Sequence, residues 1–225
     1  MYSPKRYSLL PRLTFPLGRA LIRRQLRQAG GRKIWQRPPL IINGLQSFPD
    51  GGVLILANHQ SDVDPPIIQY CLKRGVHFMG KANLFEMKIW GPVIRFYHAF
   101  PLNKDRVDRK ALKHAIELLQ LGEVVCVFPE GSITPGDAIY PLERGISLII
   151  RESNPTVICA GLTGTREYFS GGSLELRKAD REVHIRWGAP FRFSEDATSE
   201  EIIHRVTHEL CALTGLPLSD SKLSE

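Results

Sequence analysis

The longest apolar runs of this chain have only the length of a β-strand. They are Val53–Ala57, Val124–Phe128 and Ile146–Ile150, whereas a helix that crosses a membrane needs roughly 18 or more consecutive apolar residues. Short apolar runs that alternate with helix-like stretches are typical of α/β domains. We therefore expect an α/β fold with a mixed, largely parallel sheet that is flanked by helices.

The composition is that of an ordinary globular protein. The 225 residues are 43% hydrophobic and 24% charged, which excludes a disordered chain, a collagen-like repeat and a coiled coil. The four cysteines are scattered without a C-x-x-C pair, so we expect no disulfide framework. Cys126 and Cys159 lie inside apolar runs and are interpreted as buried thiols in a reducing compartment. No signal-peptide pattern is present, which predicts a cytoplasmic location.

Positive charge is concentrated near the start of the sequence. The whole chain has a net charge of +7. Residues 1–49 contain ten basic residues and no acidic one, so the remaining residues contain 20 basic and 23 acidic residues. We expect residues 1–37 to form a basic amphipathic helical segment that binds an anionic membrane surface peripherally, on its cytoplasmic face. The alternative is a helix packed on its own domain. Nucleic acid is the less favoured partner, because few aromatic residues accompany the arginines and no binding module follows.

Pro38-Pro39 marks the predicted boundary, and residues 38–225 are expected to form one α/β domain. The predicted strands are Leu40–Asn43, Val53–Ala57, Phe96–Leu102, Val124–Phe128, Thr156–Leu162 and Val183–Trp187. The predicted helices are Asp64–Leu72, Arg109–Leu121 and Ser199–Leu213, the last with a capping pattern at Thr198–Glu201. Residues 144–151 fit either element, and the glycine at position 145 favours a helix.

A histidine and an aspartate follow the buried strand Val53–Ala57. His59 and Asp64 are five positions apart, and the prolines after Asp64 suit the first turn of a helix. On one continuous helix the two side chains would point about 140° apart, so they can meet only if His59 lies in the loop. A carboxylate bonded to one imidazole nitrogen leaves the other free to take a proton from a hydroxyl. The alternative is a helix cap beside an ordinary loop histidine.

Two further predicted strands are followed by turns whose residues could bind an oxyanion or a phosphate. Val124–Phe128 continues into Pro129-Glu130-Gly131-Ser132, where the Gly131 N–H could donate to an oxyanion or a phosphate. Phe96–Leu102 continues into Asn103-Lys104-Asp105-Arg106, whose two cations suit a phosphate. Each segment taken alone is equally compatible with an ordinary turn or a solvated basic loop.

The other histidines and Ser132 give weaker signals. His204 and His208 are four residues apart, but without an H-E-x-x-H pattern or a third ligand we expect no metal site. Ser132 has no G-x-S-x-G context, which argues against a hydrolase nucleophile. The remaining histidines are interpreted as structural or exposed, namely His77, His98, His114 and His184.

Taken together, these segments resemble the glycerolipid acyltransferase family over residues 40–190. Asn58–Asp64 matches the first block of that family, N-H-x-S-x-x-D, and Val127–Ser132 matches its third, F-P-E-G-[ST]. The second and fourth blocks correspond to Phe100–Arg106 and Val157–Leu162, and Lys81–Phe85 resembles the link between the first two blocks. The sequence departs from the family at position 133, where isoleucine replaces the usual arginine, and in the fourth block, which lacks its proline.

The resemblance implies that His59, oriented by Asp64, deprotonates the free hydroxyl of 1-acylglycerol-3-phosphate, which then attacks acyl-CoA or acyl-ACP and yields phosphatidate. It implies no cofactor, a lysophospholipid as partner, and backbone donors near Gly131 for the oxyanion. Substrate binding would involve Lys104, Arg106, Glu130, Gly131 and Ser132, with Glu130 ordering the site or binding an acceptor hydroxyl. Ile133 keeps open another lysophospholipid or a glycolipid as acceptor. Two competing hypotheses are a non-catalytic lipid-binding protein on the same scaffold and a hydrolase that uses Ser132.

Overall fold

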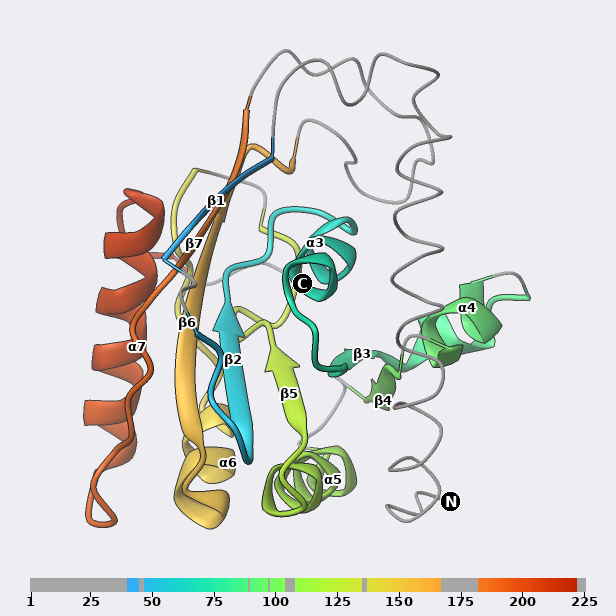
Figure 1. Ribbon diagram of the computed structural model, residues 1–225, viewed down its shortest axis with the longest axis horizontal. Helices are drawn as coiled ribbons and strands as arrows, with labels where there is room; N and C mark the ends of the chain where they lie inside the picture. The colour runs from blue at the N-terminus through green and yellow to red at the C-terminus, as the bar shows by residue number, and fades with distance from the viewer. Residues whose placement is uncertain are drawn as a thin grey trace.

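The computed structural model describes residues 40–44, 47–88, 90–96, 98–103, 108–134, 137–166 and 182–221. This part of the chain forms a seven-stranded sheet with the order β1-β7-β6-β2-β5-β3-β4 (Figure 1). The strands are β1 (Leu40–Asn43), β2 (Val53–Ala57), β3 (Val76–Lys81), β4 (Phe100–Leu102), β5 (Val124–Val127), β6 (Thr156–Thr163) and β7 (Val183–Trp187). All neighbouring strands are parallel except β6 and β7, which are antiparallel. The predicted mixed, largely parallel sheet is therefore confirmed.

Helices connect the strands and lie on both faces of the sheet. They are α3 (Asp64–Cys71), the 3₁₀ helix η1 (Ala82–Glu86), α4 (Trp90–Phe96), α5 (Arg109–Gln120), α6 (Gly145–Ser153) and α7 (Ser199–Thr214). The side chain of Asp108 caps α5 by accepting from the N–H groups of Lys110 and Ala111. Thr198 and Glu201 form the predicted capping box at the start of α7. Residues 145–151 are helical, as the glycine indicated.

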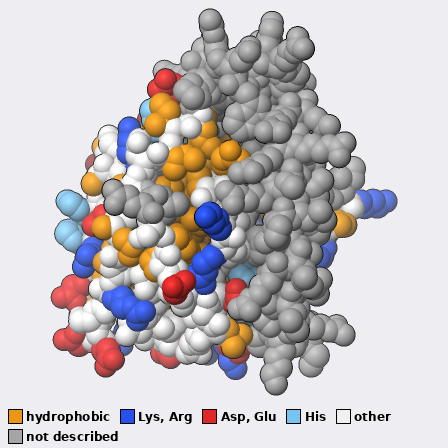
Figure 2. Space-filling view, viewed as in Figure 1, with side chains coloured by type: hydrophobic (Ala, Val, Ile, Leu, Met, Phe, Trp, Pro, Cys, Tyr) orange, Lys and Arg blue, Asp and Glu red, His pale blue; other side chains and the backbone are white. Residues whose placement is uncertain are grey.

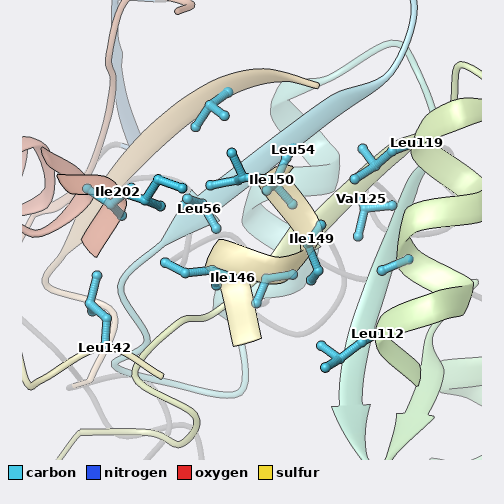
Figure 3. Close-up of a cluster of buried hydrophobic side chains, with 14 of the residues drawn as sticks. Leu54, Leu56, Leu112, Leu119, Val125, Leu142, Ile146, Ile149, Ile150 and Ile202 are labelled. Carbon is cyan, nitrogen blue, oxygen red and sulfur yellow. The ribbon is translucent and has the colours of Figure 1, made fainter. Parts of the chain in front are cut away.

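The sheet is buried on both faces, which explains why its central strands are continuously apolar. Side chains alternate between the two faces of a strand, so Leu54 and Leu56 of β2 belong to one core cluster with α5, α6 and α7 (Figure 3). Ile55 belongs to the second cluster, which includes Ile68 of α3. Both helix layers therefore fix the position of β2 and, with it, of the loop that follows.

One predicted strand differs from the structure, and one strand of the sheet was not predicted. Phe96–Leu102 was expected to be one strand, but Phe96 ends α4 and only Phe100–Leu102 forms β4. The turn between them contains His98, whose φ of 58° interrupts any regular element. Strand β3 was not predicted, because histidine and glycine interrupt its apolar pattern.

The described residues show part of the surface, whereas the predictions for the N-terminal segment lie outside them. No helix of the described part combines the length and the apolar character needed to cross a membrane. On the face seen in Figure 2, acidic and basic side chains of the described residues are interspersed. Residues 1–37, and with them the predicted basic helix and the boundary at position 38, lie outside the described residues.

Candidate active site

The strands β2, β5 and β6 run in parallel, so their carboxyl ends point to the same edge of the sheet, which we call the carboxyl edge. His59 follows β2 at this edge, and Asp64 is the first residue of α3. The predicted contact between them is present, with His59 Nδ1 2.9 Å from Asp64 Oδ2. The carboxylate is fully buried, whereas 16% of the imidazole side chain is exposed. The pair is thus accessible through its histidine only.

One carboxylate oxygen of Asp64 forms hydrogen bonds with three residues of the loop that precedes it. Besides the imidazole, Oδ2 accepts hydrogen bonds from the backbone N–H groups of Gln60, at 2.7 Å, and Ser61, at 2.8 Å. A carboxylate only accepts, so Nδ1 of His59 is the protonated ring nitrogen in this arrangement. The second nitrogen, Nε2, is consequently the one that can accept a proton from a bound hydroxyl.

The backbone of His59 is held by the segment that follows β5. Its N–H donates to Glu130 Oε2 at 2.8 Å. Its carbonyl oxygen accepts from the N–H of Thr134 at 2.8 Å and from the Thr134 hydroxyl at 3.0 Å. The ring of Phe128 stacks on the imidazole with a centroid distance of 4.0 Å and an interplanar angle of 18°. Two motifs that are 71 residues apart in sequence therefore form one unit.

Glu130 is a buried acid with both carboxyl oxygens bonded to the backbone. Oε2 binds the His59 N–H, and Oε1 accepts from the N–H of Tyr140 at 3.0 Å. Burial raises the pKa of Glu130 from 4.5 to about 7, against the opposing effect of these two N–H donors. Glu130 therefore joins the backbone at His59 to the backbone at Tyr140, and the two roles expected for it in substrate binding stay predictions.

The turn at Gly131 uses the N–H group that the sequence suggested for an oxyanion. Gly131 has a φ of 76°, which favours glycine, and its N–H donates to the carbonyl of Phe128 at 3.0 Å. The structure therefore uses this donor to close the turn. Ser132 is half-buried in the same turn. Lys104 and Arg106 lie outside the described residues, so their predicted contact with a phosphate stays a prediction.

Comparison with known proteins identifies the chain's relatives. The model of the Acyltransferase family matches residues 40–163, which include both the His59 loop and the Glu130 turn. The chain belongs to this acyltransferase family. It is 31% identical over 152 residues to a Bacillus subtilis protein named 1-acyl-sn-glycerol-3-phosphate acyltransferase, covering 65% of this chain and 71% of that one. A Streptococcus pneumoniae protein of the same name is 27% identical, with 71% and 60% covered.

A solved structure supports the same assignment. It is the 1-acyl-sn-glycerophosphate (LPA) acyltransferase PlsC from Thermotoga maritima, with a TM-score of 0.60 and 25% identity over 86% of this chain and 82% of that one. The resemblance to the glycerolipid acyltransferases is therefore confirmed, and with it the expectation of an enzyme.

Several site residues of this acyltransferase were not found from its sequence. Asn58 joins β2 to β6, because its amide donates to the Leu162 carbonyl at 2.9 Å and accepts from the Leu162 N–H at 2.7 Å. Thr134 and the stacked ring of Phe128 were missed as well. The local pattern around these residues gave no signal of contacts that bridge as many as 104 positions. The described residues contain no cluster of three or more side chains that could hold a metal ion.

Proposed function

We propose that this acyltransferase transfers a fatty acyl group from an acyl thioester, acyl-CoA or acyl-ACP, to the free hydroxyl of 1-acylglycerol-3-phosphate, with phosphatidate as the product. The observation that supports this most is the His59–Asp64 pair, bonded at 2.9 Å with a partly exposed imidazole at the carboxyl edge. The names of the relatives support the choice of acceptor.

The proposed reaction proceeds by direct transfer. Nε2 of His59 takes the proton of the acceptor hydroxyl as its oxygen bonds to the thioester carbonyl carbon. The carboxylate of Asp64 stabilises the imidazolium that forms. When the tetrahedral intermediate collapses, the carbon–sulfur bond breaks, and the leaving thiolate takes the proton back from Nε2. Atoms and charge balance without an acyl-enzyme and without a cofactor.

The surrounding contacts prepare the histidine for this step. Glu130 and Thr134 fix the backbone of His59 from both sides, while Phe128 covers one face of the ring. The imidazole therefore needs little reorganisation before it meets a substrate, which is the condition for efficient proton transfer. Lys104 and Arg106 are proposed to bind the acceptor phosphate, and Gly131 and Ser132 to line the same subsite.

A reconstituted assay tests the proposal. Purified protein is given lysophosphatidate in mixed micelles with acyl-CoA or acyl-ACP, and phosphatidate is measured. We expect His59→Gln to lower kcat by about 10²–10⁴, while His204→Gln, a change on the exposed surface of α7, leaves it unchanged. A His59→Gln protein with undiminished turnover would refute the mechanism. Other lysophospholipids and a glycolipid serve as competing acceptors, because Ile133 leaves that choice open.

The basic segment 1–37 is proposed to place the enzyme on the cytoplasmic face of a membrane as a peripheral protein. Replacement of Arg19, Arg23 and Arg27 by glutamine removes three charges that can attract anionic lipid, each worth about 1 kcal/mol near the surface. We expect binding to vesicles rich in phosphatidylglycerol to weaken at least tenfold, as measured by cosedimentation. Unchanged binding would exclude this segment as the anchor.

A further inference from the structure

A guanidinium lies beside the segment that holds His59. Strand β6 ends at the carboxyl edge with Thr163, and Arg166 follows three residues later. Its Nη2 donates to the carbonyl oxygen of Thr134 at 2.9 Å. Thr134 is also the residue whose N–H and hydroxyl bind the His59 carbonyl. Arg166 is therefore joined to His59 through a single intervening residue.

Arg166 is also distinguished by its charge. The described segments that leave β2, β5 and β6 at this edge are residues 58–64, 128–134 and 164–166, and Arg166 is the only lysine or arginine in them. Position 133, next to Thr134, is an isoleucine and supplies no charge. An anionic substrate that reaches His59 from this side would thus meet Arg166 as its nearest fixed cation within these segments.

The ion pair between Arg166 and Asp137 is one that a phosphate can replace. Nη1 lies 3.4 Å from Oδ1 of Asp137, a carboxylate that is 82% exposed, whereas 27% of the Arg166 side chain is exposed. Ion pairs at the surface with such geometry are weak. A phosphate dianion can accept two shorter, charge-assisted hydrogen bonds from the same planar guanidinium group. The bond to Thr134 meanwhile keeps the guanidinium in place.

We propose that Arg166 binds the phosphate group of the acceptor and so selects phosphorylated acceptors over neutral ones. This inference rests on the proposed function and extends it, since it adds a cation from the end of β6 to the acceptor site. Thr134 then links phosphate binding to the position of the catalytic histidine. Asp137 acts as a competitor that the phosphate displaces.

Kinetics with two acceptors separate this role from a purely structural one. The enzyme is assayed with lysophosphatidate and with the monoacylglycerol of the same chain, which lacks the phosphate. We expect Arg166→Gln to lower the ratio of the two kcat/KM values by about 10- to 100-fold, mostly through KM for lysophosphatidate, and Arg166→Lys to restore part of it. Asp137→Asn, which removes the competitor, should lower KM for lysophosphatidate.

Arg192 provides a matched control. It also donates to a backbone carbonyl, that of Asn154 at 2.9 Å, but it lies near the start of β6, at the opposite edge of the sheet. Arg192→Gln should leave the ratio unchanged. If Arg166→Gln lowers kcat/KM equally for both acceptors, Arg166 only supports the loop and the proposal is wrong.

Equilibrium binding makes the test independent of turnover. Glycerol 3-phosphate, the soluble headgroup, is titrated calorimetrically into wild type, Arg166→Gln and Arg192→Gln. We expect Arg166→Gln alone to weaken binding at least tenfold, and equal binding by all three would overturn the proposal. If Arg166-dependent binding is found but wild type makes no phosphatidate, the proposed function fails while the phosphate site stands.

Discussion

Two groups of histidines and carboxylates lie in this acyltransferase, and they differ in geometry. At the carboxyl edge, His59 is bonded to Asp64 at 2.9 Å and remains 16% exposed. On the β3 side of the sheet, His77 Nε2 is 3.9 Å from Glu123 Oε2, and only 2% of the His77 side chain is exposed. A distance of 3.9 Å is beyond hydrogen-bond range. Glu123 lies near His77, but without a hydrogen bond it does not fix which ring nitrogen of His77 carries the proton.

The second group behaves as part of the core. Burial lowers the pKa of His98 from 6.5 to about 4, helped by the neighbouring His77 and opposed by Glu123. Burial also lowers the pKa of His114, whose ring packs edge-on against Phe100 with a centroid distance of 4.9 Å. The rings of His98 and His114 are neutral at pH 7 and pack as aromatic groups. His59, the histidine proposed to act in catalysis, differs from them by its hydrogen bond to a buried carboxylate and by a side chain that is 16% exposed.

The largest expected effect comes from Asp64, the anchored carboxylate. Asp64→Asn keeps an oxygen for the N–H groups of Gln60 and Ser61 but removes the charge that stabilises the imidazolium. We expect kcat for acyl transfer to fall about 10²–10⁴-fold. Thermal unfolding followed by circular dichroism verifies that the variant is folded.

The matched change in the second group is Glu123→Gln. It neutralises the acid that faces His77 without touching the carboxyl edge. Its kcat should stay within about twofold of the wild-type value, a change typical of a site with no role in the proton transfer. If Asp64→Asn and Glu123→Gln lowered kcat to a similar extent, the two groups of histidines and carboxylates would not differ in function as we expect.

Glu130 makes the stability of the carboxyl edge depend on pH. Its pKa in the folded state is raised from 4.5 to about 7, so the stabilising contribution of the protonated form is present below pH 4.5 and is lost as the pH rises through about 7. Relative to Glu130→Gln, which cannot ionise, wild type should lose roughly 2–3 kcal/mol of unfolding free energy between about pH 5 and pH 8. Urea unfolding of both proteins across this range measures the difference. A constant difference would show that Glu130 does not titrate there.

The sequence predicted the central elements of this site because its signals there are local. The buried run Val53–Ala57 indicates a strand, and the two prolines after Asp64 fix the first turn of α3. With both ends defined, geometry allows His59 and Asp64 to meet, and the structure shows that contact. The strands β1, β2 and β7 were predicted with the bounds that the structure gives them.

The rest depends on contacts between distant segments, which local patterns do not encode. The N–H of His59 meets Glu130 only because β2 and β5 are neighbours in the sheet, and strand order cannot be read from the amphipathic pattern. The same holds for Thr134 and Arg166. Strand β3 was missed because His77, a polar residue in sequence terms, is buried there within the core.

His98 gives the smaller of the two expected changes in unfolding free energy, and its sign is opposite to that of Glu130. Because the folded state lowers its pKa to about 4, its contribution to stability is present above pH 6.5 and is lost as the pH falls through about 4. His98→Asn removes this titration, and asparagine tolerates the φ of 58° at this position. Between about pH 7.5 and pH 5, wild type should lose roughly 2 kcal/mol more unfolding free energy than the variant. Parallel urea midpoints for the two proteins over that range would mean that His98 is not kept neutral by the core. The contrast with the partly exposed His59 would then rest on geometry alone.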